Sequence, residues 1–109
     1  MNPSYILRIN VTLALHKSHR DKQMTFSHYI DFVPVEGMKI KFTNEEDEEL
    51  EIMLINLHYD FKAREWVEDQ QDDTLLEELR EPDRSECTVL PGRAEEYINF
   101  YKSFGWTLK

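Results

Sequence analysis

The residues of this chain that could do chemistry are four histidines, one cysteine and many carboxylates. His16, His19 and Asp21 lie close together, and two imidazoles with a carboxylate can bind zinc or nickel. A zinc site needs three or four converging ligands, and a spacing of three along a strand puts two histidines on opposite faces. We therefore predict a solvated polar turn here, and no metal site.

A second pair of histidines, His28 and His58, lies within apolar segments. His28 falls between Phe26 and Ile30, where a buried imidazole needs hydrogen-bond partners and stays neutral. If both histidines line one cleft between a helix and a sheet, the chain could be a small enzyme or a ligand-binding protein. The alternative is that His28 is a histidine of the core or its rim.

The other catalytic signatures are missing from the sequence. Cys87 is the only cysteine, so it forms no internal disulfide, and it follows Glu86 rather than the positive charge that activates a thiol. The three glycines, Gly37, Gly92 and Gly105, are too far apart to form a phosphate-binding loop. We therefore expect no catalytic residue and no cofactor.

Charge is the most informative property of the sequence. The 109 residues carry a net charge of −9, and residues 43–90 alone carry −13, from four Lys or Arg against seventeen Asp or Glu. Such a field repels phosphate and anionic lipid, so we expect neither nucleic acid nor a membrane as a partner. The densest acidic segment comprises Glu45, Glu46, Asp47, Glu48, Glu49 and Glu51.

The acidic segment has two interpretations. It can be a solubilising loop that keeps a sheet edge from pairing, or a surface that presents carboxylates to a basic protein. We favour a non-enzymatic protein-interaction module that binds another protein through its acidic half or an exposed sheet edge. One alternative is an acidic mimic of nucleic acid that inhibits a DNA- or RNA-binding protein, and another is the histidine cleft.

The location expected from the sequence is the cytoplasm. The first residues, Met1–Ser4, lack the basic and apolar regions of a signal peptide. No run approaches the roughly 18 apolar residues of a membrane span. A single cysteine also suits a reducing compartment. The oligomeric state is left open.

Alternating apolar residues predict the strands that position these groups. Tyr5–Leu15 alternates strictly, and Met24–Phe32 alternates again after a polar connection, which predicts an antiparallel hairpin. Pro34 interrupts regular pairing, and Val35–Gly37 predicts a turn. Met38–Phe42 predicts a short third strand.

The middle of the chain is less regular. Leu50–Tyr59 predicts a fourth strand with apolar residues on both faces, which indicates a central strand covered twice or a β-bulge. A fifth strand is expected around Arg64–Glu68, with Trp66 directed inward. Thr74–Leu79 predicts one or two helical turns, and Cys87–Leu90 has the composition of an edge strand.

Pro91–Phe104 predicts the principal helix, because apolar residues recur there at spacings of three and four. Phe100 borders this apolar stripe. Gly105 suits the left-handed position that ends a helix, with Trp106 folding back near Tyr101. The stripe consists of Ala94, Tyr97, Ile98, Tyr101 and Phe104.

Together these elements predict a single α+β domain over residues 1–109. Its expected core is a twisted antiparallel sheet of five or six strands, with the C-terminal helix packed on one face. The alternative is an SH3-like, partly open barrel covered by the helix. The feature that suggests this alternative is Pro34–Ile40, with its turn glycine Gly37, followed by a two-sided strand.

Overall fold

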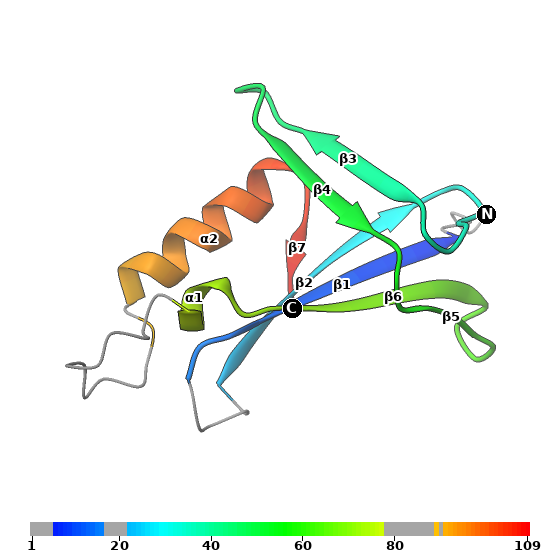
Figure 1. The fold of residues 1–109 in the computed structure, drawn as a ribbon, viewed down its shortest axis with the longest axis horizontal. Coiled ribbons are helices and arrows are strands. Elements are labelled where there is room, and N and C mark those ends of the chain that lie inside the picture. Colours follow the sequence, from blue (N-terminus) through cyan, green and yellow to red (C-terminus); the bar gives the residue numbers. More distant parts are fainter. Residues whose placement is uncertain (1–5, 17–21, 78–88, 90) are drawn as a thin grey trace.

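The computed structural model describes residues 6–16, 22–77, 89 and 91–109. They form an α+β domain with a five-stranded sheet, a separate two-stranded sheet and a C-terminal helix (Figure 1). The strands of the main sheet lie in the order β5 (Leu57–Asp60), β6 (Glu65–Asp72), β1 (Leu7–Ala14), β2 (Gln23–Ile30) and β7 (Thr107–Leu108). The small sheet contains β3 (Lys39–Thr43) and β4 (Glu49–Met53), and the helices are α1 (Thr74–Glu77) and α2 (Pro91–Ser103).

The predicted N-terminal hairpin is confirmed. β1 pairs antiparallel with β2, from Leu7 opposite Ile30 to Ala14 opposite Gln23. Every second side chain of β1 is buried, as the strict alternation requires, because successive side chains of a strand point to opposite faces. The turn at Val35–Gly37 is also confirmed: Met38 N donates to Val35 O at 3.0 Å, and Gly37 has a φ of 87°.

The main sheet is mixed rather than wholly antiparallel, which corrects the predicted architecture. β1 pairs in parallel with β6, from Leu7 opposite Trp66 to Leu13 opposite Asp72. The third and fourth strands do not join this sheet but pair with each other as the hairpin β3–β4. The described strands therefore form two sheets and no closed barrel.

The predicted fourth strand, Leu50–Tyr59, is two strands in different sheets. The chain leaves β4 at Leu54, which exchanges backbone hydrogen bonds with Gly37 and Met38 at 2.7 and 2.8 Å, and enters β5 at Leu57. The apolar residues of Leu50–Tyr59 alternate differently in its two halves because β4 belongs to the small sheet and β5 to the main sheet. Neither a bulge nor a doubly covered strand is present in this segment.

A buried carboxylate holds the break between β4 and β5. Glu68, which has no exposed surface, accepts hydrogen bonds from the backbone amides of Ile55 at 3.3 Å and Asn56 at 3.0 Å. It also accepts one from Gln70 Nε2 at 2.9 Å, and the same nitrogen donates to Met53 O. These polar groups of β6 satisfy a backbone that would otherwise lack partners at the crossover.

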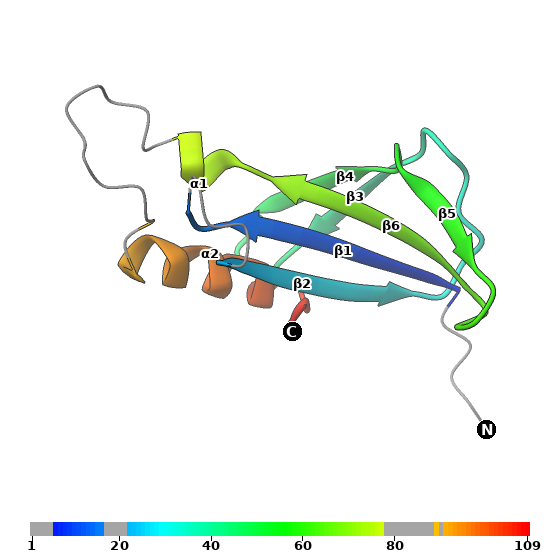
Figure 2. The same ribbon diagram turned by 90° about the horizontal axis from the view of Figure 1, so that it is seen from below.

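The core lies between the main sheet and a layer made of α2 and the hairpin β3–β4. Buried residues of β1 pack with Ile52 and Leu54 of the hairpin segment and with aromatic residues of α2. The rings of Phe26 and Tyr101 stack with centroids 4.6 Å apart. In Figure 1 the helix and the hairpin lie above the strands, and in Figure 2, seen from below, the main sheet lies in front of both. The predicted packing of the helix on one face is therefore confirmed.

The end of α2 follows the prediction. Gly105 has a φ of 87°, and Trp106 N donates to Tyr101 O at 3.2 Å. The Trp106 ring returns to the Tyr101 ring at a centroid distance of 5.5 Å. The chain then adds β7 to the free edge of β2, a strand of two residues that the sequence pattern did not indicate.

The remaining predictions have mixed outcomes. Trp66 lies in β6 and packs against the core as expected, but β6 extends to Asp72, beyond the predicted end at Glu68. α1 begins as predicted, with Asp72 Oδ1 accepting from Thr74 N at 2.9 Å, and the expected turns beyond Glu77 lie outside the described residues.

The predicted edge strand Cys87–Leu90 lies outside the described residues except for Val89. The amide of Val89 donates to Leu15 O at 2.9 Å. Neither helix in the described part of the chain is long and apolar enough to cross a membrane.

Candidate functional site: an acidic groove

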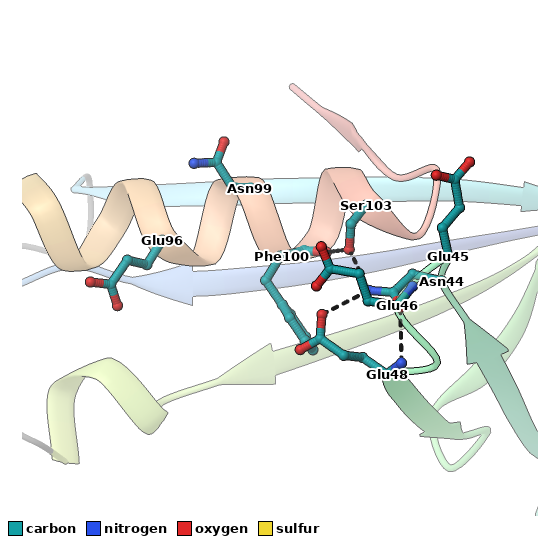
Figure 3. A pocket seen from close by; sticks show the side chains of 8 residues that line it. All are labelled: Asn44, Glu45, Glu46, Glu48, Glu96, Asn99, Phe100 and Ser103. Carbon is teal, nitrogen blue, oxygen red and sulfur yellow. Dashed lines mark hydrogen bonds between the residues drawn. The ribbon is translucent and has the colours of Figure 1, made fainter.

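An open groove of about 610 Å³ lies between the β3–β4 turn and the C-terminal half of α2 (Figure 3). Three carboxylates come from the turn and one from the helix, and the ring of Phe100 supplies an apolar wall between them. We call this site the acidic groove. Its lining residues are Asn44, Glu45, Glu46 and Glu48 from the turn, and Glu96, Asn99, Phe100 and Ser103 from α2.

Asn44 shapes the turn that forms one wall of the groove. Its Oδ1 atom accepts hydrogen bonds from the backbone amides of Glu46 at 3.0 Å and Glu48 at 2.9 Å. Asp47 N donates to Asn44 O at 3.2 Å, and Asp47 has a φ of 61°. Asparagine and aspartate favour such turns because their short polar side chains bond the local backbone and tolerate left-handed conformations.

Asn44 also joins the turn to the helix. Its Nδ2 atom donates to Ser103 Oγ at 3.0 Å and to Glu48 Oε1 at 3.0 Å. Ser103 Oγ in turn donates to Phe100 O at 2.6 Å, within the last turn of α2. The two walls of the acidic groove are therefore connected by a direct side-chain hydrogen bond (Figure 3).

The structure divides the acidic segment that the sequence singled out. Glu45, Glu46 and Glu48 line the groove, whereas Asp47 is exposed beside it at the tip of the turn. Glu49 and Glu51 lie on the outer face of the hairpin. They form ion pairs there, Glu49 with Lys41 at 3.6 Å and Glu51 with Lys39 at 3.7 Å.

A smaller hollow of about 260 Å³ continues the groove along α2. It is lined by Arg93, Glu96, Tyr97 and Phe100, so it shares two residues with the acidic groove. Arg93 pairs with the Glu96 carboxylate and lies over the Tyr97 ring, 5.8 Å from its centroid. Because Arg93 offsets the charge of Glu96, the negative potential of the groove comes mainly from the turn.

His28 and His58 are not neighbours, a question that the sequence left open. His28 lies opposite Ile9, and Ile9 lies opposite Glu68, so β1 and β6 separate β2 from β5. In β5 the residue opposite Glu68 is Leu57, which therefore points to the same face of the sheet as His28. His58 is the next residue along the strand, so its side chain projects from the opposite face. The strand order, which local periodicity does not specify, produces this separation.

The two histidines contact different residues. His28 packs against Phe42 and Trp106, with ring centroids 5.1 and 5.4 Å away, and its Nδ1 lies 3.0 Å from Tyr29 O. It is a rim histidine, as the second interpretation of the sequence expected. His58 is half exposed and lies 3.8 Å from Asp69.

The other candidate residues fall partly outside the structure. His16 is described, but His19, Asp21 and Cys87 lie outside the described residues. Within the part of the chain that the structure describes, no three His, Cys, Asp or Glu side chains are arranged to hold a metal ion.

The helical wall of the groove was not predicted from the sequence. Glu96, Phe100 and Ser103 recur at spacings of four and three, which places them on one face of α2 beside its apolar stripe. That periodicity was visible in the sequence, but only the folded chain brings this face to the β3–β4 turn.

No family model matches this chain, and neither the curated proteins nor the solved structures contain a match to it. No resemblance therefore assigns a role to the acidic groove.

Proposed function

We propose that this chain is a non-enzymatic protein-interaction module whose acidic groove binds a basic segment of another protein. The observation that carries the proposal is that the carboxylates of Glu46 and Glu48 lie near the ring of Phe100, with Glu45 on the same turn (Figure 3). The volume of the groove lies within the range of sites that bind peptides and small ligands.

The chemistry of the groove suits an arginine or lysine side chain. Carboxylates form charge-assisted hydrogen bonds with guanidinium and ammonium groups, and arginine can bind a carboxylate through two parallel bonds. The apolar stem of either side chain can pack against an aromatic ring such as Phe100. A basic side chain can therefore pair with the carboxylates and pack against Phe100 at the same time.

Binding is a better explanation of these carboxylates than catalysis. General acid–base chemistry needs a carboxyl group in an apolar pocket, where burial changes its proton affinity. Glu45, Glu46, Glu48 and Glu96 are all exposed. The ion pairs of Glu49 and Glu51 with lysines also interrupt the anionic row that a nucleic-acid mimic would present, and this favours the groove.

A fluorescent nonapeptide with three arginines tests this proposal by fluorescence anisotropy. The double substitution Glu45→Gln and Glu46→Gln removes two charges from the groove and should weaken binding about tenfold or more. The matched control, Glu49→Gln with Glu51→Gln, removes the same charge outside the groove and should change the dissociation constant less than about threefold.

Equal weakening by the two double variants would show that binding depends on net charge alone, which contradicts a groove-specific site. Absence of binding at millimolar peptide in low salt would also contradict it. Binding should weaken as salt is added, because exposed charge pairs are screened.

A further inference from the structure

β5 is the outermost strand at one side of the main sheet. Its inner side pairs with β6, and none of the described strands pairs with its outer side. Such an edge presents unpaired backbone groups to solvent, and proteins usually guard it with lysine, proline or a bulge. The four residues of β5, Leu57–Asp60, contain no lysine and no proline, and the strand is protected by its short length and by Asp60 at its end.

Exposed apolar side chains also lie in β5 and directly before and after it. Ile55 is 66% exposed, Tyr59 40% and Phe61 87%. Tyr59 lies between its neighbours, with ring centroids 5.3 Å from Trp66 and 5.1 Å from Phe61. Three aromatic rings thus lead from Trp66 of β6 through Tyr59 of β5 to Phe61 in the turn that follows.

Both ends of β5 are held in place. At its start the Glu68 carboxylate binds the amides of Ile55 and Asn56. At its end Asp60 Oδ1 accepts hydrogen bonds from Lys62 N at 3.0 Å and Ala63 N at 3.2 Å. An edge that is already fixed in extended form loses little conformational entropy when another strand pairs with it.

We propose that β5 pairs antiparallel with β5 of a second copy of this chain, about a two-fold axis at Tyr59. The main sheet would then continue from one copy into the other. This inference is independent of the acidic groove and goes beyond the function proposed for it. A two-fold contact uses the same strand twice, so the strand must complement itself.

The residues of β5 meet that requirement in this register. On the apolar face Tyr59 lies opposite its own copy, and Phe61, in the turn that follows β5, lies beside Leu57 of the other chain. Aromatic and aliphatic cross-strand pairs of this kind stabilise antiparallel sheets. On the other face His58 of each chain lies opposite Asp60 of the other, so a basic group meets an acidic one.

Two copies of this acidic chain repel each other less at this edge than at their acidic surfaces. Residues 54–64 contain Lys62 and Arg64 against one acid, Asp60, although they lie within the most acidic part of the chain. The β3–β4 turn with its carboxylates lies on the other side of the molecule from β5 in Figure 1. Two copies can therefore meet through β5 without bringing their acidic grooves together.

Sedimentation equilibrium of the full chain between about 5 and 500 μM tests the pairing. The unmodified chain should show a concentration-dependent dimer. Tyr59→Lys places two like charges across the axis and should weaken dimerisation about tenfold or more. Thr107→Lys, which adds a lysine to the edge strand β7, is the control and should leave the dimer unchanged.

Two further variants keep the test decisive if Tyr59→Lys folds poorly. Phe61→Ser changes a side chain that is 87% exposed, so it should weaken the dimer without lowering the melting temperature. In a Cys87→Ser background, Tyr59→Cys should form a disulfide between chains on mild oxidation, and Thr107→Cys should not.

A chain that stays monomeric at 500 μM would overturn the proposal. A dimer that persists in Phe61→Ser and in a folded Tyr59→Lys, or that fails to cross-link through Tyr59→Cys, would overturn this register. The groove variant Glu45→Gln with Glu46→Gln should dimerise normally, so failure of the groove proposal is separable from failure of this one.

Discussion

Asn44 and Ser103 are 59 residues apart in the sequence, and the side-chain amide of Asn44 donates a 3.0 Å hydrogen bond to the Ser103 hydroxyl. This bond connects the β3–β4 turn to the last turn of α2, the two elements that form the acidic groove. The same asparagine accepts two backbone hydrogen bonds within the turn. It therefore has a local role and a long-range role that mutation can separate.

Asn44→Ala should cost more stability than Ser103→Ala. The first change removes the acceptor of the Glu46 and Glu48 amides as well as the link to α2, so we expect a loss of about 1–2 kcal/mol in the free energy of unfolding. The second removes the link and the exposed hydrogen bond from Ser103 Oγ to Phe100 O, but leaves the turn's backbone amides with their acceptor, so it should cost less than about 1 kcal/mol. Urea unfolding measures both values. Equal losses would contradict the local role of Asn44.

Glu68 should be more important for stability than any exposed carboxylate. Glu68→Ala leaves the amides of Ile55 and Asn56 without an acceptor at the crossover, and should lower the free energy of unfolding by about 2–4 kcal/mol. Glu68→Gln retains one oxygen acceptor and should lose about half as much. Glu95→Ala on the exposed side of α2 is the control, with an expected change below about 0.5 kcal/mol. A similar effect of Glu68→Ala and Glu95→Ala would show that the crossover is held by other contacts.

Tyr101 should make the protein less stable at alkaline pH. Burial, and then the nearby charge of Asp72, raise the pKa of the Tyr101 hydroxyl well above its ordinary value of 10.0. The unfolded chain loses this proton near the ordinary pKa while the folded chain keeps it. The stabilising contribution is therefore complete below pH 10 and falls above it by up to about 1.4 kcal/mol per pH unit.

Tyr101→Phe is the variant that isolates this effect. It removes only a long contact of 3.5 Å to Asp72, so its stability at pH 7 should change by less than about 1 kcal/mol. The phenyl ring can keep the stacking on Phe26. Stability measured by urea unfolding between pH 9 and 11 should fall less steeply in the variant, and parallel curves would contradict the assignment.

Local periodicity determined much of the secondary structure. The alternation in β1 and β2 predicted a hairpin, and the apolar stripe with Gly105 predicted α2 and its end. These features depend on contacts between residues close in sequence, or on the left-handed backbone that glycine adopts at little steric cost. The α+β class followed because the apolar face of the sheet and the stripe of the helix had to cover each other.

Only the acidic residues of the candidate site could be predicted from the sequence. The acidic residues of the β3–β4 turn were evident from composition, but which of them face a groove depends on the ion pairs of Glu49 and Glu51 and on the approach of α2. The order of residue types along the chain does not specify that α2 lies against the β3–β4 turn. The division of Leu50–Tyr59 into two strands was hidden for the same reason, since it depends on Glu68 accepting hydrogen bonds from Ile55 and Asn56.

The amino-acid sequence by itself thus determined the faces of the strands, the end of the helix and the sign of the surface charge. Only the tertiary structure decided the order of the strands, the parallel pairing of β1 with β6, the separation of His28 from His58 and the assembly of the groove. The physical reason is that side-chain periodicity specifies which face of an element is buried. Which element lies against that face is decided by contacts between distant residues, such as Asn44 with Ser103.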